Sequence, residues 1–354
     1  MKILIVADDL TGALDSAVAF TRSGRIVRVA RRVETLPDVL RTGADVICVN
    51  TASREEPEAV AIARVEAVGA AVDLASVPVV MKKVDSRLKG HVAAETRILA
   101  RLAGRPRVVA APAIPDMGRF QTDGVIHGSG LADPISLSAR FGAGVSFPDI
   151  GSDDDLRAAV SEQDAPTLWA GARGLAFALA EAAFGAPDTA WQDLQSPTLM
   201  ALGSRDPITV AQVSAIDGQY PVRLAPNGAV PEITGGASTV VVAIGPGAEE
   251  IPSAIAAAAF AEGIARLATS MKPYSLLVGG GETADSLLEE LGIGALTVLA
   301  ETAPGVPVCS ADASWGPLLI ATKSGGFGPP DLLSRILSDV GPGSRTSRAG
   351  NSEI

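Results

Sequence analysis

Two consecutive carboxylates, Asp8 and Asp9, follow a run of five apolar residues near the start of the chain, and apolar residues then recur at helical spacing. A carboxylate at the point where a strand gives way to a helix can orient the hydroxyl groups of a ligand or accept a proton. It can also serve only as the N-cap of the helix. Because neighbouring side chains in a strand point to opposite faces, the two aspartates are not expected to share one role. Asp9 is predicted to face a substrate, with Asp8 as the alternative.

A second polar group lies at residues 82–89, in the sequence KKVDSRLK, which follows an apolar segment. The chain has only six lysines and a formal net charge of -11, so this local gathering of cations is unusual. Cations at the end of a strand could hold a substrate carboxylate or a migrating phosphoryl group, and a solvated helix face is the alternative. The predicted substrate-binding residues here are Lys82, Lys83, Ser86 and Arg87, and Asp85 stands beside Asp9 as a candidate general base.

A stiff loop with two prolines, APAIPDMGR at 111–119, also follows an apolar segment. The loop could present Asp116 and Arg119 to a binding cleft, and a rigid connector is the alternative reading. Arg119 is predicted to bind substrate.

Glycine-rich turns follow three apolar segments in the second half of the chain, in LLVGGGETADSLL, ATKSGGFG and, more weakly, ALGSRDPIT. Glycine lets the backbone approach an anion closely, and a helix N-terminus offers free N–H groups. Each turn alone could be an ordinary strand–helix connection, but three of them in about 150 residues favour a phosphorylated ligand, most simply a nucleotide. The predicted nucleotide-binding residues are Ser204, Gly279, Gly280, Gly281, Glu282, Thr283, Lys323, Gly325 and Gly326.

The elements that must position these residues alternate along the chain: a short apolar strand, a polar or glycine-rich turn, then a helix. This alternation predicts an α/β fold of two domains, each with a largely parallel sheet flanked by helices. Ligands of such sheets bind at the carboxyl ends of the strands, so the active site is expected in the cleft between the domains. Predicted bounds are 1–190 for the N-terminal domain, 191–340 for the C-terminal domain and 341–354 for a tail, with a linker around 184–197.

Composition narrows the class of protein. The net charge of -11 argues against general binding of nucleic acid or of a membrane surface. The two cysteines, Cys48 and Cys309, have no metal or redox spacing, and Asp8 and Asp9 come too early for a signal peptide. No apolar stretch long enough for a transmembrane helix lacks charge, so a cytoplasmic location is expected. No metal-ligating group is predicted.

Seven short segments of the chain together resemble the four-carbon acid sugar kinase family, long catalogued as a domain of unknown function. They occur in the family's order across residues 7–328, as ADDLTGA, KKVDSRLKG, APAIPDMGR, GARGLA, GSRDPIT, GGGET and KSGGFG. The resemblance implies an N-terminal domain that binds a sugar acid, a C-terminal domain that binds ATP, and a magnesium-dependent kinase of acids such as threonate, erythronate or 2-oxo-tetronate.

The resemblance also assigns roles. Ser204, the turn from Gly279 to Thr283, and the Gly325–Gly326 pair match nucleotide contacts. The residues that match the sugar-domain motifs are Asp8, Asp9, Lys83, Asp85 and Ser86. The family pattern near DSRLKG is closer to DSTLRG, so Arg87 stands in place of a small polar residue. Phe120 and Gln121 stand where threonine-like residues are usual, which places these departures in the substrate half.

Two other functions stay open at this stage. A sensor or degenerate kinase would bind nucleotide and sugar acid without turnover. A nucleotide-cofactor oxidoreductase is disfavoured, because the first strand ends in ADDLTGA instead of a GxGxxG turn. The expected partners are a small sugar acid and ATP, and a homodimer is one alternative for the oligomeric state.

Overall fold

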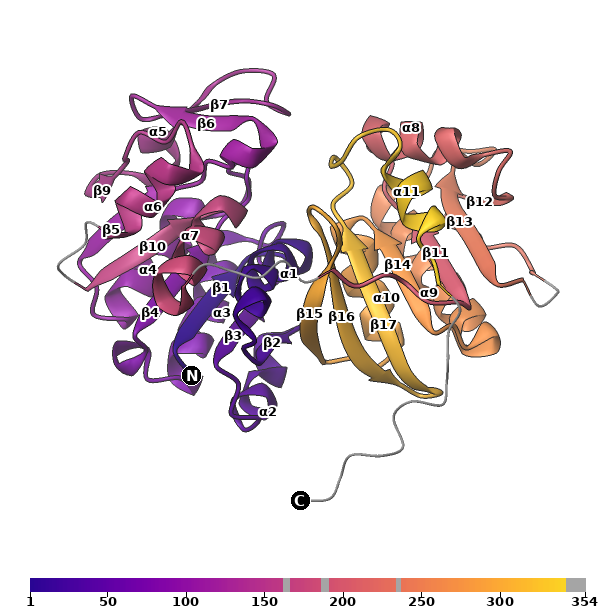
Figure 1. Cartoon of the computed structure of the whole chain (residues 1–354), viewed down its shortest axis with the longest axis horizontal. Coiled ribbons are helices and arrows are strands. Elements are labelled where there is room, and N and C mark those ends of the chain that lie inside the picture. The colour runs from indigo at the N-terminus through magenta and orange to yellow at the C-terminus, as the bar shows by residue number, and fades with distance from the viewer. Residues whose placement is uncertain (162–165, 186–190, 234–236, 342–354) are drawn as a thin grey trace. The chain divides into compact units, whose positions relative to one another are not determined.

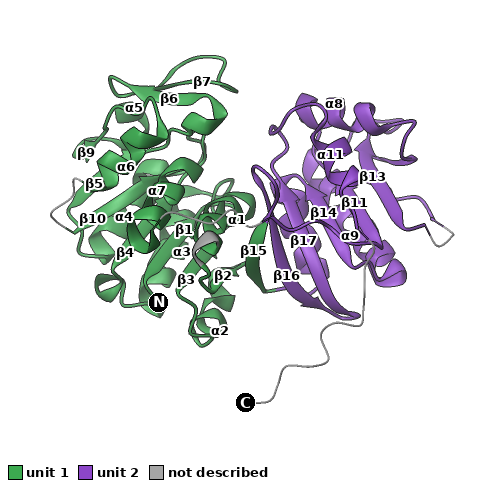
Figure 2. Cartoon of the chain, viewed as in Figure 1, with its two compact units in different colours: residues 1–190, 294–300 green, residues 191–293, 301–354 purple. Residues whose placement is uncertain are grey.

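The computed structural model describes residues 1–161, 166–185, 191–233 and 237–341. The chain divides into two compact units (Figure 2): unit 1 holds residues 1–190 and 294–300, and unit 2 holds residues 191–293 and 301–354. The predicted linker lies partly outside the described residues, and the predicted tail lies almost wholly outside them. The expected site in a cleft between domains stays a prediction.

Unit 1 contains a mostly parallel sheet (Figure 1). All neighbouring pairs in it are parallel except the edge pair of β15 with β2. The strands, in spatial order, are β15 (Ala295–Ala303, of which 295–300 belong to this unit), β2 (Val27–Ala30), β3 (Val46–Asn50), β1 (Ile3–Ala7), β4 (Val79–Lys83), β10 (Thr167–Gly171), β5 (Arg107–Ala111) and β9 (Val145–Ser146).

The helices of unit 1 form two groups. In one group α3 packs against α2 and α4, and α4 packs against α5; in the other, α7 packs against α1 and α6. A small antiparallel sheet joins β6, β7 and β8. The bounds are α1 (Leu10–Ala17), α2 (Leu36–Leu40), α3 (Glu58–Ala71), α4 (Val92–Leu102), α5 (Leu137–Phe141), α6 (Asp153–Ser161), α7 (Arg173–Phe184), β6 (Arg119–Thr122), β7 (Val125–Gly128) and β8 (Ile135–Ser136).

Unit 2 contains a second sheet in which five strands are parallel and β16 pairs antiparallel with β17. Helix α9 packs on α10, and α8 packs on α11. The strands, in spatial order, are β12 (Val222–Pro226), β13 (Thr239–Gly245), β11 (Thr198–Leu202), β14 (Ser275–Gly279), β17 (Gly316–Lys323) and β16 (Val306–Ala313). The helices are α8 (Pro207–Ile216), α9 (Ser253–Met271), α10 (Gly281–Glu290) and α11 (Leu332–Ser338).

The central strands are buried along their whole length, as the continuous apolar runs predict. Every residue of β1, β3, β11 and β14 is buried. The predicted α/β class with largely parallel sheets is therefore confirmed, and so is the positioning principle: the carboxyl ends of the parallel strands carry the polar and glycine-rich turns.

Helix α9 is long and apolar enough to cross a membrane by length and composition alone. It packs against α10 in the fold, and 39% of its most apolar window is buried. Glu262 and Arg266 form an ion pair on its exposed surface. One face of α9, which includes Phe260 and Ile264, is buried in unit 2, and the other face carries this ion pair, so the helix is amphipathic.

Candidate functional site

In unit 2, three strand ends meet at one level of the sheet. Leu202 of β11 pairs with Gly279 of β14, which in turn pairs with Lys323 of β17. Beyond that level the turns bond to one another, because Gly203 N donates to Gly279 O at 2.9 Å and Gly280 N donates to Lys323 O at 2.8 Å. The three turns predicted to bind a nucleotide therefore lie side by side.

The turns approach so closely that glycine is needed at two of the contacts. A Cβ on Gly325 would collide with Oγ of Ser204, and a Cβ on Gly203 would collide with Oγ1 of Thr283. Gly280 has a φ of +109°, which L side chains rarely adopt, and it forms the N-cap of α10. The first backbone N–H groups of α10 have no acceptor within the helix, as at any helix N-terminus, and such groups can bind an anion.

Lys323 is fully buried, and its side chain forms hydrogen bonds with the turn that follows it, at residues 324–325. Its Nζ donates to Oγ1 of Thr209 at 3.1 Å and to the main-chain oxygens of Ser324 and Gly325 at 2.9 and 3.2 Å. Burial lowers the pKa of Lys323 to about 8, although Asp206 opposes the shift. An ammonium has three N–H donors, and all three have protein acceptors here. This geometry suits a residue that shapes the turn around 323–326, and a direct nucleotide contact stays a prediction.

In unit 1, three carboxylates from two segments of the chain converge on one guanidinium. Arg54 donates to both oxygens of Asp8, at 3.0 and 2.9 Å, and to Asp9 Oδ1 at 2.6 Å. Its Nη1 lies 3.5 Å from Oδ1 of Asp85. The side chain of Arg54 is only 14% exposed, so the cluster is largely shielded from solvent. Asp8 and Asp9 reach the same cation, and alternation along the strand does not separate them as expected.

Electrostatics keep Asp8 ionised. Burial alone would raise the pKa of its carboxyl group, but Arg54, Lys82 and Lys83 outweigh burial and lower the pKa to about 2. A carboxylate with so low a pKa is a weak base near neutral pH. Asp8 is therefore suited to holding charge or accepting a hydrogen bond.

Asp9 and Asp85 differ in the hydrogen bonds that their carboxylate oxygens accept. Asp9 is the N-cap of α1: its Oδ1 accepts from Gly12 N at 3.1 Å and its Oδ2 from Thr11 Oγ1 at 2.7 Å. Asp85 accepts from the main-chain N–H groups of Arg87 and Lys89 on Oδ2 alone, at 3.1 and 3.2 Å. Among the described residues, the only polar partner of its Oδ1 is Nη1 of Arg54, at 3.5 Å. Asp85 Oδ1 is thus the least occupied oxygen of the cluster.

Two lysines of the 82–89 segment, Lys82 and Lys83, are the last residues of strand β4, whereas Lys89 is an exposed residue of the loop that follows. Lys82 is fully buried in an ion pair with Glu95 of α4, with Nζ 2.9 Å from Oε2, and Glu95 also accepts from Ser53 Oγ. Lys83 is 4% exposed and donates to Val84 O at 2.7 Å. Lys82 therefore contributes positive charge to the cluster from the buried interior of unit 1. This burial does not favour its predicted contact with a substrate.

Ser86, Arg87 and Arg119 lie together at the other side of the Asp85 turn. Arg119 Nη1 donates to Ser86 O at 3.1 Å, and Arg119 Nε donates to Ser129 O at 3.1 Å. Burial lowers the pKa of Arg119, and the positive charge of Arg87 lowers it further. The predicted substrate residues of the two loops are thus brought together.

Sequence reasoning missed Arg54 and Glu95. Arg54 lies in the loop TASREEP, four residues after the end of β3, and nothing in that loop is unusual by composition. The available signal was topological: β3 and β1 are parallel neighbours, so residues just after each strand meet at one edge.

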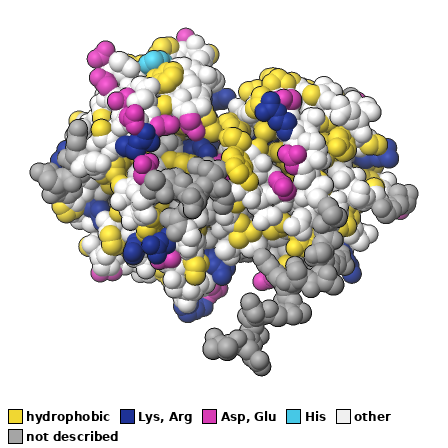
Figure 3. Space-filling view, in the orientation of Figure 1, with side chains coloured by type: hydrophobic (Ala, Val, Ile, Leu, Met, Phe, Trp, Pro, Cys, Tyr) yellow, Lys and Arg dark blue, Asp and Glu magenta, His cyan; other side chains and the backbone are white. Residues whose placement is uncertain are grey.

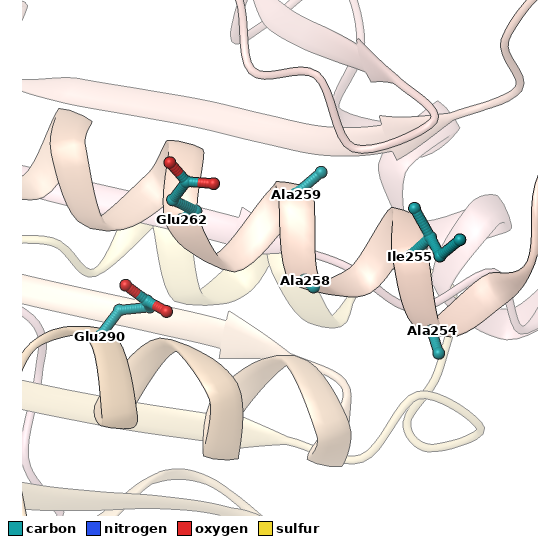
Figure 4. A pocket seen from close by; sticks show the side chains of 6 residues that line it. All are labelled: Ala254, Ile255, Ala258, Ala259, Glu262 and Glu290. Carbon is teal, nitrogen blue, oxygen red and sulfur yellow. The ribbon is translucent and has the colours of Figure 1, made fainter.

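The remaining surface features lie apart from these residues. A hollow of about 640 Å³ on unit 2 is lined by alanines and Ile255 of α9 together with Glu262 and Glu290 (Figure 4). Glu290 is the last residue of α10, whereas the glycine turn is at its first. On the face shown in Figure 3, Lys and Arg side chains of the described residues lie in small groups among carboxylates and apolar side chains. That pattern differs from a continuous basic surface for nucleic acid.

Two family models match the chain in the same order as the two units. A "Sugar-binding N-terminal domain" matches residues 3–140, and a "Nucleotide-binding C-terminal domain" matches residues 199–333. A D-threonate kinase of Cupriavidus necator is 30% identical over an alignment that covers 94% of this chain and 96% of that protein. The chain belongs to the four-carbon acid sugar kinase family. The resemblance drawn from the seven motifs is confirmed.

A second kinase and one solved structure are also similar to this chain over nearly its whole length. A 3-oxo-tetronate kinase of Methylobacterium radiotolerans is 27% identical, with 94% of this chain and 97% of that protein covered. A crystal structure from Salmonella typhimurium LT2, of a protein provisionally named a tRNA synthase, superposes with a TM-score of 0.74 over 94% of this chain and 98% of that one. At 21% identity, this likeness supports the fold alone.

Proposed function

We propose that the chain is an ATP-dependent kinase that phosphorylates a hydroxyl group of a four-carbon sugar acid such as threonate, erythronate or 2-oxo-tetronate. The observation that carries this proposal is the match to a D-threonate kinase along almost the whole of both chains. Unit 1 binds the sugar acid and unit 2 binds ATP, and the reaction takes place in the cytoplasm, where ATP is available.

Unit 2 supplies the phosphate contacts. The turn at Gly279–Thr283 presents main-chain N–H groups at the start of α10, where the helix dipole favours negative charge. Ser204 and the Gly325–Gly326 turn pack against it and complete the phosphate-binding surface. Phosphoryl transfer depends mostly on such positioning and charge stabilisation.

Unit 1 holds the sugar acid, whose hydroxyl group accepts the phosphoryl group. The cluster around Arg54 gathers three carboxylates that can contact the hydroxyl groups of a bound polyol. Asp85 is the general base in this proposal, because its Oδ1 is the oxygen with fewest donors, and Asp9 is the alternative. Asp8, with its low pKa, orients a substrate hydroxyl by accepting its hydrogen bond.

Magnesium fits this site as an ion that is bound mainly by ATP. Among the described residues no group of three or more His, Cys, Asp or Glu is arranged to hold a metal ion. Magnesium in kinases needs only one or two carboxylates beside the phosphates, and Asp206 and Glu282 flank the turns. When bound, the ion neutralises charge on the transferred phosphoryl group.

The test is to incubate the protein with ATP, magnesium and a panel of four-carbon acids and to measure ADP release and the phosphorylated acid. We expect acid-dependent ADP formation with at least one of them. Binding of both ligands without ADP would identify a non-catalytic sensor. Reduction of an oxo-acid by a nicotinamide cofactor, without phosphate transfer, would identify an oxidoreductase and overturn the proposal.

A further inference from the structure

The cations that sequence analysis grouped together have separate roles in the fold. Lys82 is neutralised by Glu95, at 2.9 Å, in the interior of unit 1. Lys83 points toward α1, since a Cβ on Gly12 would lie 2.9 Å from its Nζ and would also collide with Asp9. Both lysines thus belong to the carboxylate cluster around Arg54. Of that group, Arg87 and the exposed Lys89 form no ion pair with any described residue, and Arg87 lies near Arg119 of the neighbouring loop.

These two arginines meet over Gly130. A Cβ on Gly130 would lie 2.8 Å from Nη2 of Arg119 and 3.7 Å from Nη2 of Arg87, so one carboxylate placed there could contact both guanidinium groups. Two like charges this close destabilise each other unless an anion lies between them. Neither arginine forms an ion pair with a carboxylate anywhere in residues 1–161, 166–185, 191–233 or 237–341.

The remaining donors of both side chains suit a carboxylate. Arg119 gives one N–H from each of its three nitrogens to main-chain oxygens of Ser86 and Ser129. A guanidinium has five N–H groups, so one remains on Nη1 and one on Nη2. No hydrogen bond within the described part of the chain involves the guanidinium of Arg87, which is half-buried. Arg119 is thus fixed in place by the protein, and Arg87 keeps all its donors.

We propose that Arg87 and Arg119 form a subsite for the carboxylate of the substrate and make the site selective for acids over neutral sugars. This inference rests on the proposed function and deepens it. The Arg54 cluster, which is rich in carboxylates, then takes the hydroxyl end of the same molecule. A polyol without a carboxylate gains nothing from the paired guanidinium groups, and it leaves their mutual repulsion unrelieved.

The decisive variant is Arg87→Gln, because the guanidinium of Arg87 makes no hydrogen bond or ion pair with any described residue. Calorimetry without ATP should show that the Kd for D-threonate rises about tenfold or more, the loss expected for one charge-assisted hydrogen bond. Binding of threitol, the neutral analogue, should not change. The melting temperature without ligand should equal or exceed that of the wild type, since a repulsion is removed. Arg87→Lys, which keeps the charge without the planar fork, should lie in between.

Arg97→Gln is the matched control, because it removes one exposed arginine of α4 in the same unit. It should leave the Kd for D-threonate unchanged. In turnover assays Arg87→Gln should raise KM for the acid with kcat and KM for ATP nearly unchanged. An unchanged Kd and KM in Arg87→Gln would overturn the subsite, as would failure of the wild type to bind any four-carbon acid.

The two proposals fail in different ways. Acid binding that depends on Arg87, without ADP formation from any acid, would keep the subsite and refute the kinase. ADP formation with a KM for the acid that ignores Arg87 would keep the kinase and refute the subsite.

Discussion

At the scale of single residues, Asp85 and Asp9 differ in the number of hydrogen bonds that their carboxylate oxygens accept. Asp85→Asn should lower kcat at least about a hundredfold, because loss of a general base typically costs 10²–10⁴ in rate. KM for ATP should stay close to the wild-type value. Steady-state assays of ADP release with saturating acid would measure this.

Asp9→Asn is the comparison for that experiment. Asparagine caps helices as well as aspartate does, so α1 should keep its stability. We expect a smaller loss of kcat than in Asp85→Asn. If Asp9→Asn instead abolished turnover while Asp85→Asn remained active, the base would be Asp9.

Arg54 is expected to be the most sensitive side chain of the cluster. Arg54→Met leaves three carboxylates without this partner, so the free energy of unfolding should fall by about 3 kcal/mol at pH 7. Because the folded-state pKa of Asp8 is about 2, against 3.8 ordinarily, ionised Asp8 contributes stability above pH 3.8 that is lost as the pH falls toward 2. The difference between wild type and variant should therefore narrow from pH 4 to pH 2.

Urea denaturation at several pH values would measure this difference. Arg41→Met is the control, because Arg41 pairs with Asp38 at the surface, with both side chains more than 70% exposed. Surface pairs contribute about 0–1 kcal/mol, so this variant should resemble the wild type at every pH. A difference for Arg54→Met that stayed constant down to pH 2 would mean that Asp8 is not stabilised by this arginine.

The contacts of Arg54 with the aspartates could not be predicted from the sequence. Asp8, Asp9 and Asp85 could be singled out because acidic residues directly after apolar strands are conspicuous. Arg54 sits 46 residues from Asp8, in an ordinary polar loop, and only the pairing of β3 with β1 brings the two together. Contacts of that kind depend on strand order, which the sequence pattern alone leaves open.

At the scale of elements, the close approach of the unit 2 turns makes Gly325 critical. Gly325→Ala would push the turn away from Ser204 and should raise KM for ATP about tenfold or more, while KM for the acid stays the same. Gly341→Ala is the matched control, because a Cβ there meets no atom within 4 Å and the backbone is not in the left-handed region. Equal KM values for ATP in the two variants would remove the Gly325 turn from the nucleotide site.

The elements themselves were largely predictable. Strands such as β1 and β14 are continuous apolar runs that end in polar or glycine residues, and both sides of that transition are visible in the sequence. Two features were not visible. Lys82 and Lys83 read as turn residues, because an internal lysine is rare without a buried partner such as Glu95. The antiparallel strand β16 has apolar and polar residues in a mixed order that gives no clear period.

At the scale of the whole molecule, unit 1 is not a continuous piece of chain. Residues 294–300 supply β15, whose Ala295–Val298 segment pairs with β2. A fragment ending at residue 190 therefore exposes the free edge of β2, and such edges promote aggregation. We expect fragment 1–190 to aggregate and a version with residues 294–300 joined by a flexible linker to remain monomeric in size-exclusion chromatography. A monomeric, cooperatively folded 1–190 fragment would show that β15 is dispensable.

Because unit 1 is discontinuous in sequence, its sheet cannot be completed during translation until residues 294–300 have been synthesised. About 110 residues separate residue 190 from the end of the 294–300 segment, and a ribosome that adds 5–20 residues per second needs roughly 5–20 s to make them. For that interval the nascent chain carries a complete β1–β3–β2 arrangement whose outer strand has no neighbour. We expect this exposed edge to promote aggregation during that interval, so slowing translation between codons 191 and 300 should increase aggregation of nascent unit 1.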